Sequence, residues 1–169
     1  MRGVLAIPCA ATCAAAFAIL LAGAAARAGD EKLPAKVMDA LKAKFPKAEI
    51  RKWTREKEAD KVVYDIEFKQ EGRNFEADIF EDGSIHNWER AIEAKDLPAA
   101  VKKTLDAKYP KANLKEVMQV MAVKDGKDEV DGYEIVLTTA DNRSGEVTIA
   151  PDGKLVEEEF AEPKKKDAK

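Results

Sequence analysis

An 18-residue stretch occurs twice in this chain. Leu33–Ile50 reads LPAKVMDALKAKFPKAEI and Leu97–Leu114 reads LPAAVKKTLDAKYPKANL, with ten identical positions at a separation of 64 residues. Internal similarity at a fixed separation predicts that one structural unit is used twice. We expect the first unit at residues 29–96 and the second at residues 97–160.

Each copy predicts one short amphipathic helix. The apolar positions that recur every four residues are Leu33, Val37, Leu41 and Phe45 in the first copy, and Leu97, Val101, Leu105 and Tyr109 in the second. Such spacing places each set on one helix face. Pro46 and Pro110 end the helices, because the residue before a proline avoids the helical conformation. A helix of about ten residues is marginal alone in water, so each must pack on an apolar surface.

The segments after each helix predict that surface. Apolar and polar residues alternate along segments 62–69, 75–80, 85–88, 133–137, 147–149 and 155–156. An alternation of this kind is typical of half-buried antiparallel strands, and Asp-Gly pairs at 82–83 and 152–153 mark tight turns. Segments 50–55 and 114–123 are interpreted as first strands, residues 124–132 as a longer hairpin loop and residues 89–96 as a short charged linker.

The predicted fold is therefore α+β. Two tandem units, each a helix plus a four-stranded antiparallel sheet, form one continuous curved sheet with the helices on one face. Both units together are long enough to bury a core, whereas 64 residues alone would be marginal.

Residues 1–28 predict a secretory signal peptide. Arg2 precedes an apolar run that closes with Ala26-Arg27-Ala28, which places cleavage before Gly29. The alternative is an uncleaved membrane anchor, because the apolar run is nearly long enough to span a bilayer. Cys9 and Cys13 both lie in this segment, so the mature chain can form no disulfide, and Ala24 stands where a lipidated cysteine would be. We expect a periplasmic or secreted protein without a stable membrane anchor.

The mature chain is acidic. Removal of Arg2 and Arg27 leaves 27 basic and 32 acidic residues, a balance that argues against nucleic acid as the partner. The stretch from Glu157 onwards is charged and nearly without apolar residues, so it is expected to fray, with residues 161–169 forming a disordered charged tail.

The order and doubling of these motifs resemble the PepSY-like domains related to beta-lactamase-inhibitor proteins. The shared features are Leu-Pro-Ala, the helix, Phe/Tyr-Pro-Lys-Ala, an alternating strand and Asp-Gly-x-Ile/Leu, over residues 33–159. The resemblance implies an exported α+β domain that acts as a binding or inhibitory module, with no catalytic residues. The chain departs from the inhibitor prototype by lacking disulfides.

No catalytic constellation is evident in the sequence. The single histidine, His86, has no nucleophile or carboxylate at a spacing that makes a catalytic pair. Glu67 could face Glu76 or Asp78 across a hairpin, which we interpret as a solvated sheet face. With no glycine-rich phosphate loop either, we expect no enzymatic activity and no cofactor.

The segment Asp125–Gly132 suggests a second, cation-responsive function. Its acids stand at relative positions 1, 4, 5 and 7, which fails the calcium-loop pattern. We interpret it as a polar hairpin loop, and keep a calcium-binding envelope protein as the alternative function.

The leading hypothesis is an exported, non-enzymatic module that binds a protein or peptide ligand. Inhibition of a secreted or periplasmic protein would be one outcome of such binding. A sheet covered by helices on one side leaves its other face open, where an apolar patch would mark an interaction site. The candidate ligand-binding residues on that face are Phe80, His86, Trp88, Met118, Val120 and Val136. Alternatively these residues form a dimer contact or pack beneath the tail. A slip of one residue in a strand would exchange the two faces.

Overall fold

The computed structural model describes residues 32–58 and 60–161, so the predicted signal peptide and the end of the tail lie outside the described residues. The elements are α1 (Ala35–Lys44), β1 (Glu49–Glu58), β2 (Lys61–Gln70), β3 (Arg73–Phe80), β4 (Ile85–Ala91), the 3-10 helix η1 (Ala94–Asp96), α2 (Ala99–Lys108), β5 (Asn113–Lys124), β6 (Lys127–Thr138), β7 (Ser144–Ile149) and β8 (Leu155–Phe160). The α+β class predicted from the sequence is confirmed.

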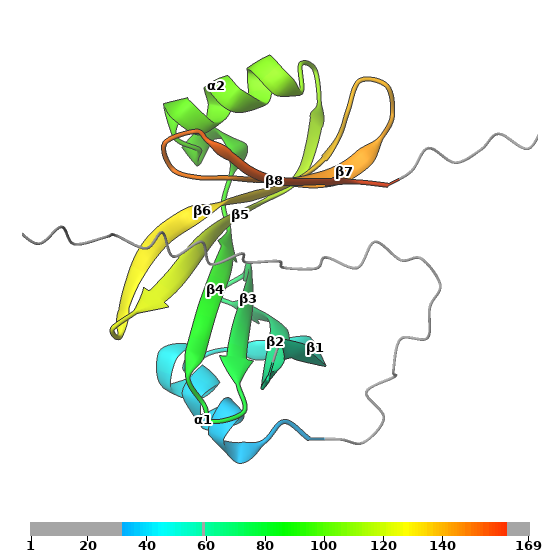
Figure 1. Cartoon of the computed structure of the whole chain (residues 1–169). Helices are drawn as coiled ribbons and strands as arrows, with labels where there is room; N and C mark the ends of the chain where they lie inside the picture. The colour runs from blue at the N-terminus through cyan, green and yellow to red at the C-terminus, as the bar shows by residue number, and fades with distance from the viewer. Residues whose placement is uncertain (1–31, 59, 162–169) are drawn as a thin grey trace, which may run out of the picture.

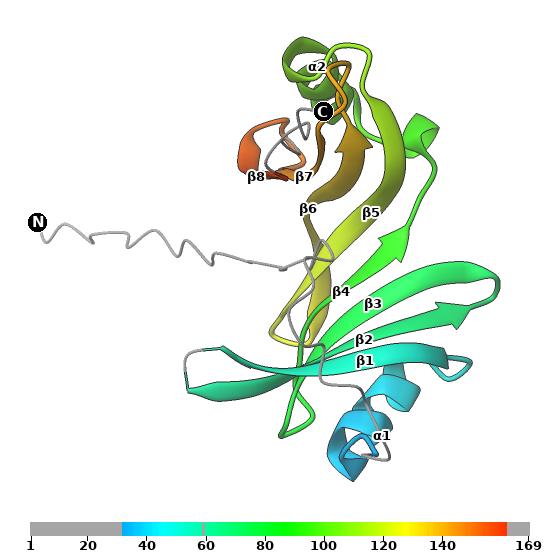
Figure 2. The same ribbon diagram turned by 90° about the vertical axis from the view of Figure 1, so that its right-hand side faces the viewer.

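All eight strands belong to one antiparallel sheet in chain order, with β4 of the first half paired to β5 of the second. Figure 1 shows α1 and α2 on the outer sides of their own halves, at opposite ends of the molecule. The helix-free faces of the two halves turn toward each other, and the view in Figure 2 agrees with this arrangement. The sheet is therefore curved, with both helices on its outer side.

Each helix buries its predicted apolar stripe against the strands that follow it. The first core joins Leu33, Val37, Leu41 and Phe45 to Tyr64, Ile66, Phe68, Ala77, Ile79 and Trp88. The second joins Leu97, Val101, Leu105 and Tyr109 to Val117, Tyr133, Ile135, Leu137, Val147 and Ile149. This packing stabilises helices too short to persist alone. Within the described chain, neither helix has the length and apolar character needed to cross a lipid bilayer.

The two Asp-Gly turns hold the sheet close beneath the helices. Gly83 and Gly153 both have a φ of +90°, a conformation that glycine adopts without steric cost. A Cβ atom at Gly83 would lie 3.0 Å from the Lys36 carbonyl oxygen, and one at Gly153 only 2.7 Å from the Ala100 carbonyl oxygen. The turns are thus contact points for the first helical turn as well as strand connections.

Three predicted boundaries are corrected by the strand pairing. The β5–β6 hairpin turns at Asp125-Gly126, whose positive φ angles suit a two-residue turn, so most of the expected loop 124–132 is strand. Residues Glu157–Phe160 pair with β7 as part of β8 and do not fray. β4 continues to Ala91, so Glu89 lies in the sheet and outside the linker. In these three places the backbone pairs with a neighbouring strand, and the local amino-acid composition does not indicate that pairing.

One ion pair connects α1 to the distant β5–β6 hairpin. Lys44 Nζ lies 2.7 Å from Asp128 Oδ1, and it also lies 5.4 Å from the centre of the Trp88 ring. The helix of the first half therefore contacts a strand of the second half directly, beyond the β4–β5 pairing.

Candidate functional site: an acidic, helix-free sheet face

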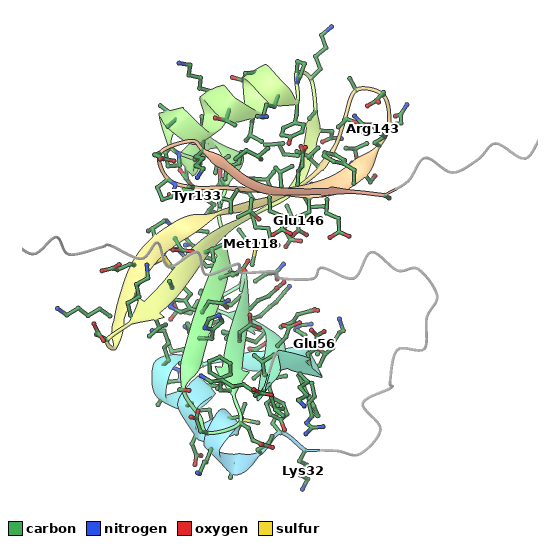
Figure 3. All side chains as sticks on the ribbon, viewed as in Figure 1. Lys32, Glu56, Met118, Tyr133, Arg143 and Glu146 are labelled. Carbon is green, nitrogen blue, oxygen red and sulfur yellow. The ribbon has the colours of Figure 1, made fainter. Side chains whose placement is uncertain are left out.

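Strand register assigns a set of side chains to the sheet face opposite the helices, which we call the helix-free face. Its central members are Asp65, Glu67, Glu76, Asp78, Asn87, Glu89, Met118, Val120, Glu134, Val136 and Glu146. Figure 3 labels Met118 and Glu146 between the two halves of the molecule, on the side away from both helices. Strands β2 to β7 all contribute to this face.

Carboxylates lie directly opposite one another across this face. Asp65 pairs with Asp78, and Glu67 pairs with Glu76. Glu76 in turn pairs with Glu89 on the next strand. Like charges directly opposite on neighbouring strands destabilise a sheet, so the described fold carries an electrostatic cost along three consecutive strands.

Asp65 and Glu76 are largely removed from water, contrary to the solvated face predicted around Glu76, whereas the side chain of Glu67 stays 39% exposed as predicted. Burial, followed by repulsion from Asp65 and Glu67, raises the pKa of Glu76 to about 8. Burial and repulsion from Asp78 likewise raise the pKa of Asp65 to about 6. Curvature of the sheet removes these groups from water, which disfavours their charged forms.

Three glutamates from β4, β6 and β7 form the deepest part of the face. Glu89 is 4 % exposed and Glu134 is 6 % exposed. Burial comes first in raising the pKa of each of the three, and repulsion from neighbouring carboxylates adds to it in every case. Glu134 donates a hydrogen bond to Glu146, which raises the pKa of Glu134 and opposes the rise for Glu146. We call Glu89, Glu134 and Glu146 the glutamate triad.

The triad depends on curvature. Glu146 repels Glu89 although β4 and β7 are three strand spacings apart in the sheet. A flat sheet would separate these strands by about 14 Å, at about 4.8 Å per spacing. The bend between the two halves, visible in Figure 1, brings the side chains nearer.

The triad lacks compensating partners. Glu89 Oε2 and Glu146 Oε2 are buried and accept no hydrogen bond. Among the described residues, the ion pairs involve other side chains, and the one on this face joins Lys52 Nζ to Glu67 Oε1 at 2.9 Å, near the β1 edge. Buried carboxylates are normally paired or hydrogen-bonded. Carboxyl groups that are buried without a partner and have raised pKa values are typical of functional sites.

The chemistry available on this face is binding of positive charge. Over residues 32–58 and 60–161, no group of three or more histidine, cysteine or acidic side chains is arranged to hold a metal ion. The face offers carboxyl groups at several adjacent positions whose raised pKa values keep them largely protonated, and a cationic group brought by another molecule would favour their ionised forms.

Phe80 and His86 come together at one end of the first half. Their ring centroids lie 5.2 Å apart, and Lys61 Nζ lies 4.5 Å from the centre of the Phe80 ring. Phe80 pairs with Val63, on the same face as Asp65. Phe80 and His86 therefore lie next to each other, and their role in binding stays a prediction.

Trp88 lies on the opposite face from the one predicted. Its ring packs against Phe45 of α1, with centroids 5.5 Å apart, and belongs to the first core. The reason is a bulge: Asp78 pairs with Asn87 but Ile79 pairs with Ile85, which leaves His86 as an extra residue. A bulge of one residue exchanges the faces of the residues beyond it.

Met118, Val120 and Val136 lie on the helix-free face by register, opposite Glu134, Gly132 and Glu116 respectively. Met118 is 4 % and Val120 is 6 % exposed, so these two offer little free apolar area. The large hydrophobic side chains exposed in the described chain are Val130 and Val156. The broad apolar patch expected from the sequence is therefore replaced by a carboxylate-lined face with a narrow apolar strip.

Sequence reasoning missed the glutamate triad. Glu89 falls in the segment predicted as a linker, Glu134 falls at a polar position of a predicted strand, and Glu146 stands one residue before the predicted strand 147–149. A signal was available, because every strand from β2 to β8 carries at least one acidic residue at a position facing away from the core. Repetition of one charge on neighbouring strands is unusual for a merely solvated surface.

Two surface hollows lie elsewhere. One lies among the end of α2, the β6–β7 connection and β8 and is lined by residues that include Tyr109, Arg143 and Phe160. The other is lined by residues that include Met38 of α1 and Trp53 of β1. Neither hollow includes a carboxylate of the triad. We regard the helix-free face as the candidate site because it holds buried carboxyl oxygens without hydrogen-bond partners. The hollows contain satisfied side chains such as the Tyr109 hydroxyl, which donates to Glu158.

Several solved structures share this fold. A protein from Bacteroides eggerthii that is described as "putative periplasmic" aligns with a TM-score of 0.61 at 16% identity, covering 77% of this chain and 90% of that one. A DUF2874 family protein from Bacteroides uniformis aligns with a TM-score of 0.59 at 16% identity, covering 75% and 88%. A BLIP-like protein from Bacteroides fragilis aligns with a TM-score of 0.54 at 17% identity, covering 83% and 94%. No curated protein matches the sequence.

The family comparison agrees with the resemblance found in the sequence. The family described as "Putative beta-lactamase-inhibitor-like, PepSY-like" matches residues 26–87 and, in a second overlapping region, residues 64–157. These two regions cover most of the chain. The chain belongs to this PepSY-like family.

Proposed function

We propose that this protein is an exported, non-enzymatic binding module that holds a protein or peptide ligand on its helix-free face. The observation that carries the proposal is the buried glutamate triad, whose carboxylates have no cationic partner in the described chain. A fold that retains this electrostatic cost on its open face gains an interaction with a complementary ligand.

Two further observations support the proposal, and a third concerns the origin of the sheet that carries the site. Both helices pack on the other side of the sheet, so neither helix of the described chain covers the helix-free face. The structural neighbours include proteins named as BLIP-like and as periplasmic, which is compatible with an exported binding module and with inhibition as its outcome. The bulges at Arg51 and Lys115 occupy corresponding places in the two halves, which supports an origin of the sheet from two copies of one unit.

Paired capture experiments test the proposed surface. Glu116→Lys reverses one charge on the helix-free face, where Glu116 acts on both Glu76 and Glu146. Asp39→Lys makes the same change on the exposed side of α1. Mature wild-type and variant proteins are immobilised and exposed to an envelope fraction, and bound proteins are identified by mass spectrometry. We expect Glu116→Lys to lose a partner that Asp39→Lys retains. Equal capture by the two variants would contradict the proposed surface.

A further inference from the structure

Resting on the proposed function, we propose that the group recognised by the helix-free face is a series of lysine or arginine side chains on an extended segment of a partner protein. One of these basic side chains places its charged end at the triad of Glu89, Glu134 and Glu146.

The triad provides the primary position. Glu89 Oε2 is buried, lies on this face by register and accepts no hydrogen bond. Glu134 and Glu146 lie close enough to share a hydrogen bond, and both act electrostatically on Glu89. A guanidinium or ammonium group supplies several N–H donors and no acceptor, so it satisfies carboxylate oxygens that have no other partner.

The apolar strip beside the triad suits the stem of the same side chain. Met118 lies opposite Glu134, and Val120 lies opposite Glu89, on the strand between them. Lysine and arginine carry three or four methylene groups that pack on apolar surface while the charged end reaches a polar partner. The strip is nearly buried, so the methylene stem would lie along its small exposed part, a contact that a long basic side chain can make and a compact cation cannot.

The length of the acidic row favours a segment over a free amine. Opposed carboxylates continue from the triad through Glu76 to Glu67 on β2. The distance from β2 to β7 is five strand spacings, or at most roughly 24 Å, since the bend of the sheet shortens it. An extended chain presents alternate side chains on one side about every 7 Å, so at most about seven residues with basic residues at alternate positions match the row.

The charge of this face excludes other classes of ligand. A polyanion such as nucleic acid would be repelled by it. Over the described residues, the acidic side chains do not form a group arranged for a metal ion, which argues against a divalent cation as the primary occupant.

Isothermal titration with a defined peptide tests this inference. The probe is the N-acetylated, C-amidated peptide Arg-Ser-Arg-Ser-Arg-Ser-Arg, and the control is the same peptide with neutral citrulline in place of arginine. At low ionic strength and pH 8 we expect the folded mature protein to bind the arginine peptide and to ignore the citrulline peptide. Binding must weaken with added salt, because surface charges are screened.

Proton release gives a readout specific to the triad. A bound cation favours the ionised forms of carboxyl groups whose pKa is raised, so binding near pH 7 releases protons. The measured heat should therefore depend on the ionisation enthalpy of the buffer, and affinity should rise between pH 6 and pH 8.5. Glu89→Gln should weaken binding at least about tenfold, while Glu81→Gln, at an exposed turn, should leave it unchanged.

The outcomes separate this inference from the proposed function. Absence of binding, equal affinity of Glu89→Gln and wild type, or equally tight binding of free arginine overturns the inference. If Glu116→Lys still abolishes partner capture in that case, the helix-free face remains the binding surface and its ligand is not a basic segment. Circular dichroism of each variant establishes that it is folded before binding is compared.

Discussion

Glu76 of β3 and Glu89 of β4 lie directly opposite each other on neighbouring strands, with both side chains on the helix-free face. Glu76 raises the pKa of Glu89, and Glu89 raises the pKa of Glu134. For Glu76 and Glu89, burial is the largest cause of the raised pKa. Two glutamates in this arrangement cannot both ionise without cost, because neither solvent nor a cation compensates the charge. This cost makes the stability of the protein depend on pH.

The melting temperature is expected to fall as the pH rises. The pKa of Glu76 rises from an ordinary value of 4.5 to about 8 in the folded protein. Below pH 4.5 the group is protonated in both states, and between pH 4.5 and 8 the folded state binds more protons than the unfolded state. Stability therefore decreases through this window. We expect Tm to fall by roughly 5–10 °C between pH 5 and 8.5.

Differential scanning calorimetry at several pH values checks this prediction. Acids with lowered pKa, such as Asp82 and Asp141, change their protonation below this window and do not interfere. A constant or rising Tm between pH 5 and 8.5 would show that the opposed carboxylates are solvated.

Neutralising one member of the triad is expected to stabilise the protein at alkaline pH. Glu134→Gln keeps the shape of the side chain and replaces a carboxyl group that burial and Glu89 keep protonated in the folded protein, although it ionises in the unfolded protein. Its unfolding free energy should exceed that of wild type by about 1–2 kcal/mol at pH 8.5 and differ little at pH 5. Urea denaturation at both pH values measures the difference. Glu81→Gln is the matched control, and an equal effect of both substitutions would count against a buried triad.

Truncation of Trp88 is expected to destabilise the first core. The ring lies against Phe45 and Phe75, with centroids 5.5 Å and 6.3 Å away. Trp88→Ala should cost about 3–5 kcal/mol because it leaves a cavity beneath α1. Trp88→Phe should cost less, since an aromatic ring still fills part of the site. Denaturant titration followed by circular dichroism measures both losses. A Trp88→Ala protein as stable as wild type would contradict the placement of Trp88 in the first core.

A pair of glycine substitutions tests the close contact between the second Asp-Gly turn and α2. Gly153 and Gly72 both have positive φ angles, but only at Gly153 would a new Cβ atom meet neighbouring atoms, with the Ala100 carbonyl oxygen at 2.7 Å. Both alanine variants carry the conformational cost of about 1 kcal/mol. Gly153→Ala should cost about 1–3 kcal/mol more, because α2 or the turn must shift.

Thermal denaturation of the two glycine variants compares these costs under one set of conditions. Similar losses for Gly72→Ala and Gly153→Ala would mean that the helix accommodates the methyl group without strain.

Local features of the sequence predicted the helices, the apolar face of most strands and the two Asp-Gly turns. The helices end at Lys44 and Lys108, one residue before the Phe45 and Tyr109 that precede each proline. Prediction succeeded here because helix periodicity, proline geometry and turn chemistry act over a few neighbouring residues. The one-residue bulge at His86 could not be seen in the alternation of apolar and polar residues. It places Trp88 in the core, where the sequence predicted the open face.

The sequence by itself determined that two short amphipathic helices pack on alternating antiparallel strands, because those preferences are local. A continuous curved sheet was expected, but only the tertiary structure decided which strands join the two halves and that Glu89 approaches Glu134 and Glu146. Residues 45 or more positions apart meet there through strand pairing and curvature. Each glutamate alone follows an ordinary polar pattern, and its burial depends on strands that lie far away in the chain.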